Sequence, residues 1–125
     1  IADLIVVRNG FAKDYPDAVV GFLAAYGRAL DMYKQKPEEA ADIVAKQAGV
    51  TPDVAARDMK EYDFVPLSEQ ATPRWLGTKA TPGEFAKTLH STAEFLVAQR
   101  SIKKTPGLEA FEAATDTSYL QKAVA

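Results

Sequence analysis

The sequence predicts a mostly helical chain, with about five helices and one short strand at the N-terminus. Several segments start with proline and carry apolar residues three and four positions apart, which is typical of the core-facing side of helices. A single run, residues 3–8, is continuously apolar and β-branched. With 125 residues and no internal repeat, the chain has the length of one domain or less.

The run Asp3-Leu4-Ile5-Val6-Val7-Arg8, closed by Asn9-Gly10, predicts a strand buried on both faces, as inside a parallel sheet. Leaving its apolar residues in water forfeits about 1.5–3 kcal/mol per large side chain. In sum this approaches the whole stability of a small domain, about 5–15 kcal/mol. No second convincing strand follows, so we expect a pairing partner outside this sequence. Because the sequence begins at Ile1 rather than Met, we also expect a processed or cleaved piece.

The first predicted helices each begin at or near a proline. Pro16 starts a long helix, Pro37 starts the next, and Thr51-Pro52-Asp53 begins a third. Gly49 is the expected C-terminal stop of the second. The apolar stripe of the first helix consists of Val19, Phe22, Leu23, Tyr26, Leu30 and Tyr33.

Two more helices are expected in the second half. Thr81-Pro82-Gly83-Glu84 predicts a capping box with proline at the first helical position. The stripe of that helix is Phe85, Leu89, Thr92 and Leu96. Asp116 is a candidate cap for a last short helix. Residues 63–80 form the one long connection, and residues 105–107 a turn.

Composition excludes several classes of function. Fifteen Lys and Arg against seventeen Asp and Glu give a net charge of −2, which argues against a nucleic-acid binder. The absence of cysteine excludes disulfides, cysteine-zinc sites and thiol nucleophiles. The apolar stretches are too short to cross a membrane. A hydrophobic content of 47% is ample for a core, which argues against disorder.

The chain is not expected to be an enzyme. His90, the single histidine, precedes Glu94 by one helical turn, which indicates a partly exposed surface pair. No second ligand stands at metal-binding spacing, and neither a nucleophile elbow nor a glycine-rich phosphate loop occurs. The acids Glu38, Glu39 and Asp42 complement a helix dipole. We therefore expect no catalytic residue, no metal site and no cofactor.

Two features are candidates for ligand binding. Asp3 is an acid at the start of a buried strand, where a carboxylate is costly unless paired or wet. It is either a solvated strand-edge residue or a counter-charge for a ligand ammonium. Arg74 and Trp75 place an anion donor beside a flat apolar wall in the long loop. Trp75 is either a loop anchor that fills a gap in the core or the lid of a pocket.

The order of several segments resembles periplasmic solute-binding proteins of the taurine, alkanesulfonate and nitrate type, the substrate-binding components of ABC importers. The resemblance is carried by residues 3–8 followed by Phe11-Ala12, residues 15–19 with Phe22, and residues 36–45. Residues 92–99 and 118–120 are similar to the C-terminal part of the same proteins. It spans nearly all 125 residues, matches the last third of such a protein, and is closest to the taurine branch.

The resemblance implies a fragment of a two-lobed α/β type II periplasmic binding protein, with residues 1–125 as its C-terminal portion. Strand 3–8 would re-enter the first lobe, and the helices would pack on that lobe. The ligand, taurine or a related sulfonate, would lie between the lobes and pass to a membrane permease. Asp3 would bind the ammonium of taurine, and the sulfonate donors would lie outside this chain. The implied location is the periplasm, after removal of a signal, or a lipid anchor outside the cytoplasmic membrane.

The unpaired strand also predicts how the isolated chain behaves. We expect self-association, either through residues 4–7 or by exchange of helices between copies, and no measurable taurine binding. One alternative is a relative that binds nitrate or a pyrimidine precursor, in which stacking on Trp75 would matter more. Another is a self-contained helical domain whose apolar faces bind a second protein.

Overall fold

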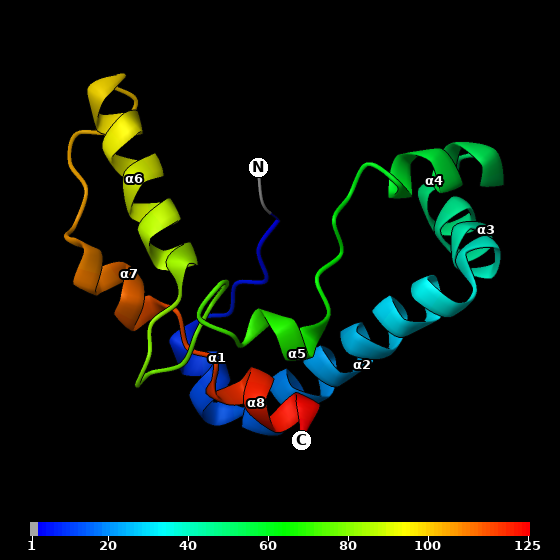
Figure 1. Ribbon diagram of the computed structural model, residues 1–125, viewed down its shortest axis with the longest axis horizontal. Coiled ribbons are helices and arrows are strands. Elements are labelled where there is room, and N and C mark those ends of the chain that lie inside the picture. The colour runs from blue at the N-terminus through cyan, green and yellow to red at the C-terminus, as the bar shows by residue number, and fades with distance from the viewer. Residues whose placement is uncertain (1–2) are drawn as a thin grey trace. The chain divides into compact units, whose positions relative to one another are not determined.

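A computed structural model describes residues 3–125, and they form two compact units, Ile1–Pro66 and Leu67–Ala125. The mostly helical prediction is confirmed, since residues 3–125 contain eight helices and no strand (Figure 1). In the first unit the helices are α1 (Asn9–Asp14), α2 (Pro16–Gln35), α3 (Pro37–Ala48) and α4 (Pro52–Met59). In the second unit they are α5 (Leu67–Gln70), α6 (Glu84–Ala98), α7 (Leu108–Ala114) and α8 (Ser118–Val124).

Prolines set the starts of α2, α3 and α4, as the sequence predicts. Each helix has its proline in the first turn, where the missing N–H removes no helical hydrogen bond. The Thr51 hydroxyl caps α4 by accepting from the Val54 N–H at 3.5 Å. Gly49 ends α3 in the left-handed conformation, with φ 71°.

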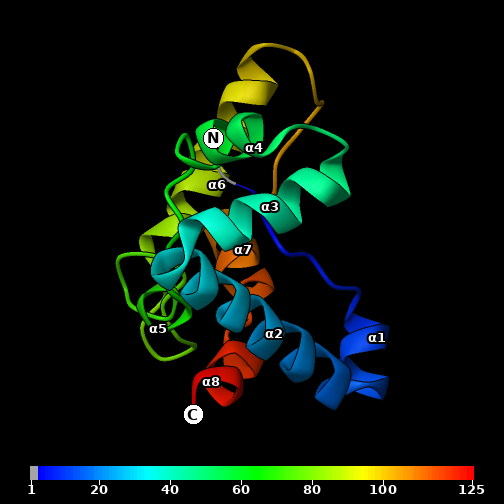
Figure 2. The same cartoon turned by 90° about the vertical axis from the view of Figure 1, so that its right-hand side faces the viewer.

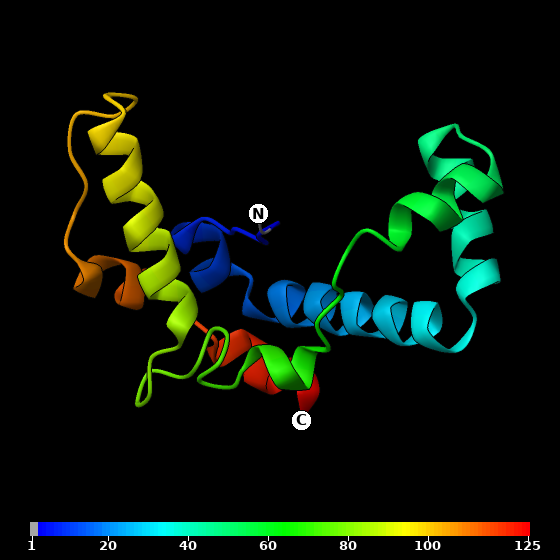
Figure 3. The same cartoon turned by 45° about the horizontal axis from the view of Figure 1, so that its top comes forward.

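The core of the first unit is a seam of alanines between α3 and α4. Ala41, Ala45 and Ala55 are at most 3% exposed, and Met59 packs against them. Because these side chains are small, the two helices lie side by side in close contact (Figure 3). The end of α2 joins the cluster through Tyr33, whose hydroxyl donates to the Met59 carbonyl at 3.4 Å.

The strand predicted over residues 3–8 is not formed. No backbone hydrogen bond among residues 3–125 involves residues 3–7, and Val6 is 84% exposed rather than buried. Asn9-Gly10, expected to close the strand, is instead the start of α1, which lies beside the beginning of α2 (Figure 2). A strand needs a neighbour for its backbone groups, and the described part of the chain supplies none.

The second unit consists of two helix pairs, α5 with α8 and α6 with α7. Leu67 on α5 and Leu120 on α8 are its buried large side chains, 7% and 4% exposed. The Asp116 carboxylate accepts from the Ser118 N–H at 2.9 Å. The N-cap of α8 is nevertheless Thr117, without a side-chain capping hydrogen bond, so the predicted cap at Asp116 is wrong. Helix α7 was not predicted.

The capping box predicted at Thr81 is wrong. Helix α6 starts at Glu84, and its N-cap is Gly83, whose lack of a side chain leaves no capping hydrogen bond. Pro82 instead forms a single β-bridge with Gly77, and Thr78 and Thr81 close a turn between them. The two chain segments of this bridge lie close together. A Cβ at Gly77 would overlap the backbone near Gly83, and a Cβ at Gly83 would overlap the backbone near Gly77, so both positions require glycine.

The chain exposes more surface than compact globules of its mass. It exposes 9403 Å², whereas even two separate globules of half its mass would together expose about 7,900 Å². None of the large side chains within residues 3–125 is fully buried, and among the exposed ones are Phe22, Tyr62 and Phe95. The excess of about 1,500 Å² is as large as the area that ordinary protein interfaces cover.

Candidate functional site

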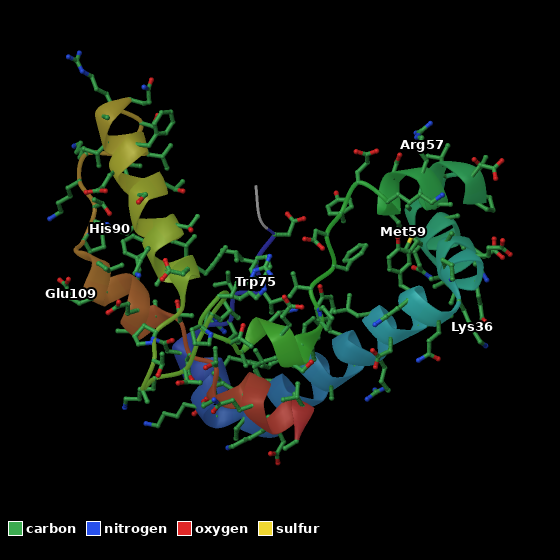
Figure 4. All side chains as sticks on the ribbon, viewed as in Figure 1. Lys36, Arg57, Met59, Trp75, His90 and Glu109 are labelled. Carbon is green, nitrogen blue, oxygen red and sulfur yellow. The ribbon has the colours of Figure 1, made fainter. Side chains whose placement is uncertain are left out.

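The second unit brings Arg74 and Trp75 together with Glu69, an acid on α5 that the sequence analysis did not single out. After α5 the chain reverses: both the N–H and the hydroxyl of Thr72 donate to the Glu69 carbonyl, at 3.0 and 2.8 Å. The Trp75 N–H then donates to the Thr72 carbonyl at 2.9 Å. This double turn returns Trp75 to the side of α5, in the loop where Figure 4 labels it.

The Glu69 carboxylate is the centre of this cluster. The indole Nε1 of Trp75 donates to Glu69 Oε1 at 3.2 Å, and Arg74 Nη1 lies 3.9 Å from the same oxygen. The Arg74 guanidinium carbon lies 5.5 Å from the centroid of the Trp75 ring, within cation–π range. One acid therefore holds both residues of the predicted pair.

The backbone of Trp75 is fixed from its other side by the start of α6. The Phe85 N–H donates to the Trp75 carbonyl at 3.0 Å, and the Glu84 N–H donates to the Pro73 carbonyl at 2.9 Å. The Thr117 hydroxyl, which is buried, donates to the Gly77 carbonyl at 2.9 Å and ties the same loop to the start of α8. The ring of Trp75 is half-buried, and its backbone N–H, its carbonyl and its indole N–H are all hydrogen-bonded, which is the geometry of a loop anchor.

The cluster offers a ligand one exposed cation and one ring face beside a partly exposed carboxylate. The Arg74 side chain is 77% exposed and its ion pair with Glu69 is long, so an anion could reach the guanidinium. The indole N–H of Trp75 is already engaged by Glu69, which leaves the ring face for stacking. A lid function for this pair remains a prediction.

Asp3 belongs to the first unit, where its side chain is exposed. None of the ion pairs found within residues 3–125 includes it. The structure therefore shows an accessible carboxylate at the start of the apolar segment. Its role as an ammonium counter-charge remains a prediction.

The surface hollows lie elsewhere. The larger, about 460 Å³, runs along one face of α6, and that helix supplies all of its lining residues. The smaller, about 290 Å³, lies at the corner between α2 and α3 and is lined mainly by charged residues. Residues 3–125 hold no group of three or more metal-binding side chains. In the same stretch no helix is both long and apolar enough to cross a membrane.

Helix α6 carries two further side-chain pairs. His90, labelled in Figure 4, has its Nδ1 3.7 Å from Glu94, as its spacing predicts. Its imidazole meets Phe111 of α7 edge-on, with ring centroids 5.6 Å apart. Lys87 Nζ lies 2.7 Å from Glu84, and this hydrogen bond raises the pKa of Lys87 above its ordinary value. Both pairs stand at helical spacing, and no group of three metal-binding side chains includes His90 in this described region.

The chain was compared with protein-family models, with curated proteins and with solved structures, and none of them matches it.

Proposed function

We propose that this chain is the C-terminal portion of the periplasmic solute-binding component of an ABC importer. In the intact protein a cleft between two α/β lobes binds taurine or a related sulfonate and delivers it to a membrane permease. The chain itself is not an enzyme and uses no cofactor. The protein acts in the periplasm, or outside the cytoplasmic membrane on a lipid anchor.

The observation that carries this proposal is the apolar segment Leu4 to Val7. It is exposed and unpaired within residues 3–125, although its side chains are those of a strand buried inside a sheet. Helices follow it, and helices are the elements that cover the faces of a parallel sheet. The excess exposed surface fits helices whose inner faces pack on such a sheet.

Ligand capture in such a receptor works by closure of two lobes. Contacts from both lobes favour the closed state, and this difference in binding free energy drives the movement. Asp3 stands where the segment begins, so its carboxylate would reach the cleft from the lobe that this strand enters. A carboxylate there favours an amino-sulfonate, because alkanesulfonates and nitrate have no ammonium group to pair with it.

The test is calorimetry on the intact protein that contains residues 1–125, with the variant Asp3→Asn. Loss of a charged hydrogen bond costs about 1.5–3 kcal/mol, so taurine should bind about 10- to 150-fold more weakly. An alkanesulfonate without an ammonium should bind almost as before. The matched control is Asp17→Asn, an exposed acid in the first turn of α2, which should leave both affinities unchanged.

Two results would contradict the proposal at different points. Equal losses of taurine and of the ammonium-free sulfonate would remove Asp3 from the site. An intact protein that binds neither class of sulfonate would remove the receptor function itself. The isolated chain should show no measurable taurine binding, and micromolar binding by it would contradict the expected division of the site.

A self-contained helical interaction domain is the second candidate, and the exposed apolar side chains of Phe22 and Phe95 favour it. Such a domain binds another protein through these faces and has a start codon near residue 1. A reading frame that continues upstream of Ile1 through a signal sequence and a lobe-sized segment excludes it.

A further inference from the structure

We propose that the loop between α6 and α7 binds an anionic phospholipid surface. The loop carries three exposed cations, Arg100, Lys103 and Lys104, and the exposed side chain of Ile102 stands between them in the sequence. These four residues are named here the basic tip. The inference goes beyond the receptor function, because it concerns a surface of the second unit and does not depend on the sulfonate site.

The basic tip lies in a stretch of the chain that has no acidic residue. Residues 95–108 contain its three cations and no Asp or Glu, although the chain as a whole has a net charge of −2. None of the ion pairs found within residues 3–125 includes Arg100, Lys103 or Lys104. Uncompensated cations at this spacing produce a local positive potential, which favours an anionic partner.

The dipole of α6 does not account for these cations. Helix α6 ends at Ala98, and its last turn contains no basic residue. Arg100 lies beyond the C-cap residue Gln99, and Lys103 and Lys104 lie further along the loop. Because the effect of a helix dipole is limited to its last turn, the positive charge of the basic tip is left for another interaction.

The backbone at Arg100 also gives no structural reason for an arginine. Arg100 has φ 60° and is the one non-glycine residue with positive φ among residues 3–125. Its N–H donates to the Val97 carbonyl at 2.9 Å. The Ser101 N–H donates to the Leu96 carbonyl, also at 2.9 Å, which completes a helix-ending turn that usually has glycine at the position of Arg100. Glycine would therefore suit this helix end better than arginine does.

The shape of the loop favours a lipid surface over a small anion or a peptide. The chain runs from the end of α6 back along that helix to α7, so the basic tip lies at the end of α6 that points away from α5 and α8 (Figure 1, Figure 3). Neither of the two surface hollows is lined by its residues. A protruding tip fits a planar surface, where the cations meet anionic headgroups and Ile102, 39% exposed, reaches the acyl boundary.

Co-sedimentation of the 125-residue chain with lipid vesicles tests the proposal. Vesicles of phosphatidylglycerol and phosphatidylcholine in equal amounts should bind it, and vesicles of phosphatidylcholine alone should bind it far more weakly. Each Lys or Arg near an anionic surface strengthens binding about fivefold, which corresponds to about 1 kcal/mol. The triple variant Arg100→Gln, Lys103→Gln, Lys104→Gln should therefore lose about 100-fold in affinity. Binding at about 0.1 M salt should disappear at about 1 M, since the screening length falls from about 10 to about 3 Å.

The matched control removes three exposed lysines of the first unit, in the triple variant Lys13→Gln, Lys34→Gln, Lys46→Gln. It changes the net charge by the same amount and should keep most of the affinity. Equal losses in the two triple variants would overturn the proposal, since net charge and not the basic tip would then determine binding. No binding to the anionic vesicles, or equal binding to both kinds of vesicle, would also overturn it. Stronger binding to soluble polyglutamate than to the anionic vesicles would overturn it in favour of an acidic protein partner.

The variant Arg100→Gly separates binding by the basic tip from the stability of the fold. It should weaken binding to the anionic vesicles about fivefold. It should also raise the urea midpoint of the second unit, because glycine adopts positive φ without strain. Unchanged vesicle binding would remove Arg100 from the binding surface, and a lower midpoint would overturn the argument from its backbone. Taurine titration of the intact protein is independent of every outcome here.

Discussion

Leu120 on α8 should hold the second unit together, because it and Leu67 are the buried large side chains there. Leu120→Ala removes the transfer free energy of the lost atoms and leaves a cavity, at a cost of about 2–5 kcal/mol. A unit of about 60 residues has a total stability of about 3–9 kcal/mol. The substitution should therefore remove about half of the stability of this unit.

Urea denaturation followed by tryptophan fluorescence measures this effect locally. Trp75 is the single tryptophan, and its indole is bonded to Glu69 on α5, the helix that packs against α8. With a slope of about 1 kcal/mol per M, a loss of about 2 kcal/mol lowers the unfolding midpoint by about 2 M.

The matched control is Phe95→Ala, a large apolar residue of the same unit that is 61% exposed. Because little of its surface is removed from water on folding, the midpoint should change by less than about 0.5 M urea. Equal shifts for Leu120→Ala and Phe95→Ala would refute the reasoning, since burial would then not determine the cost.

Two further predictions concern the loop before α6 and the first turn of that helix. Gly83→Ala should destabilise the second unit by more than the control, because the new methyl group would overlap the backbone at Trp75 and Leu76; the same urea titration measures it. Glu84→Gln should lower the pKa of Lys87, measured by NMR titration, because Glu84 is the largest cause of its elevation. The pair stabilises the fold below the unfolded-state pKa of Lys87, and this small contribution is lost as the pH rises through the folded-state pKa. An unchanged pKa in Glu84→Gln would contradict the assignment to this ion pair.

Helices α2, α3 and α4 could be predicted because their signals are local. Each of these helices has a proline in its first turn, and α3 also has a glycine directly after its last turn; both signals are visible in a few neighbouring residues. The start of α6 could not, although Thr81-Pro82-Gly83-Glu84 has the local pattern of a cap. There Pro82 forms a β-bridge with Gly77 of the preceding loop, so it lies outside the helix, which begins two residues later. This contact between separate segments cannot be read from the local sequence.

In the candidate site, too, residue types could be predicted from the sequence, whereas contacts between segments could not. Arg74 and Trp75 were recognisable as residue types, and an anchoring role for Trp75 was one of the two alternatives. Glu69, the acid that holds them, could not be recognised from the sequence. The double turn at Thr72 determines whether Glu69 lies near Arg74 and Trp75 or away from them. The short helices α1, α5 and α7 were missed because they are too short to show periodicity.

The alanine seam between α3 and α4 has a consequence for how this sequence can vary. Methyl groups determine how near two backbones come, and a longer side chain at Ala45 or Ala55 would wedge the hairpin open. The outward positions of the same helices, such as Ile43, carry no such restriction. Substitutions should therefore accumulate on one flank of the hairpin, while the inner flank admits little beyond alanine, serine and glycine.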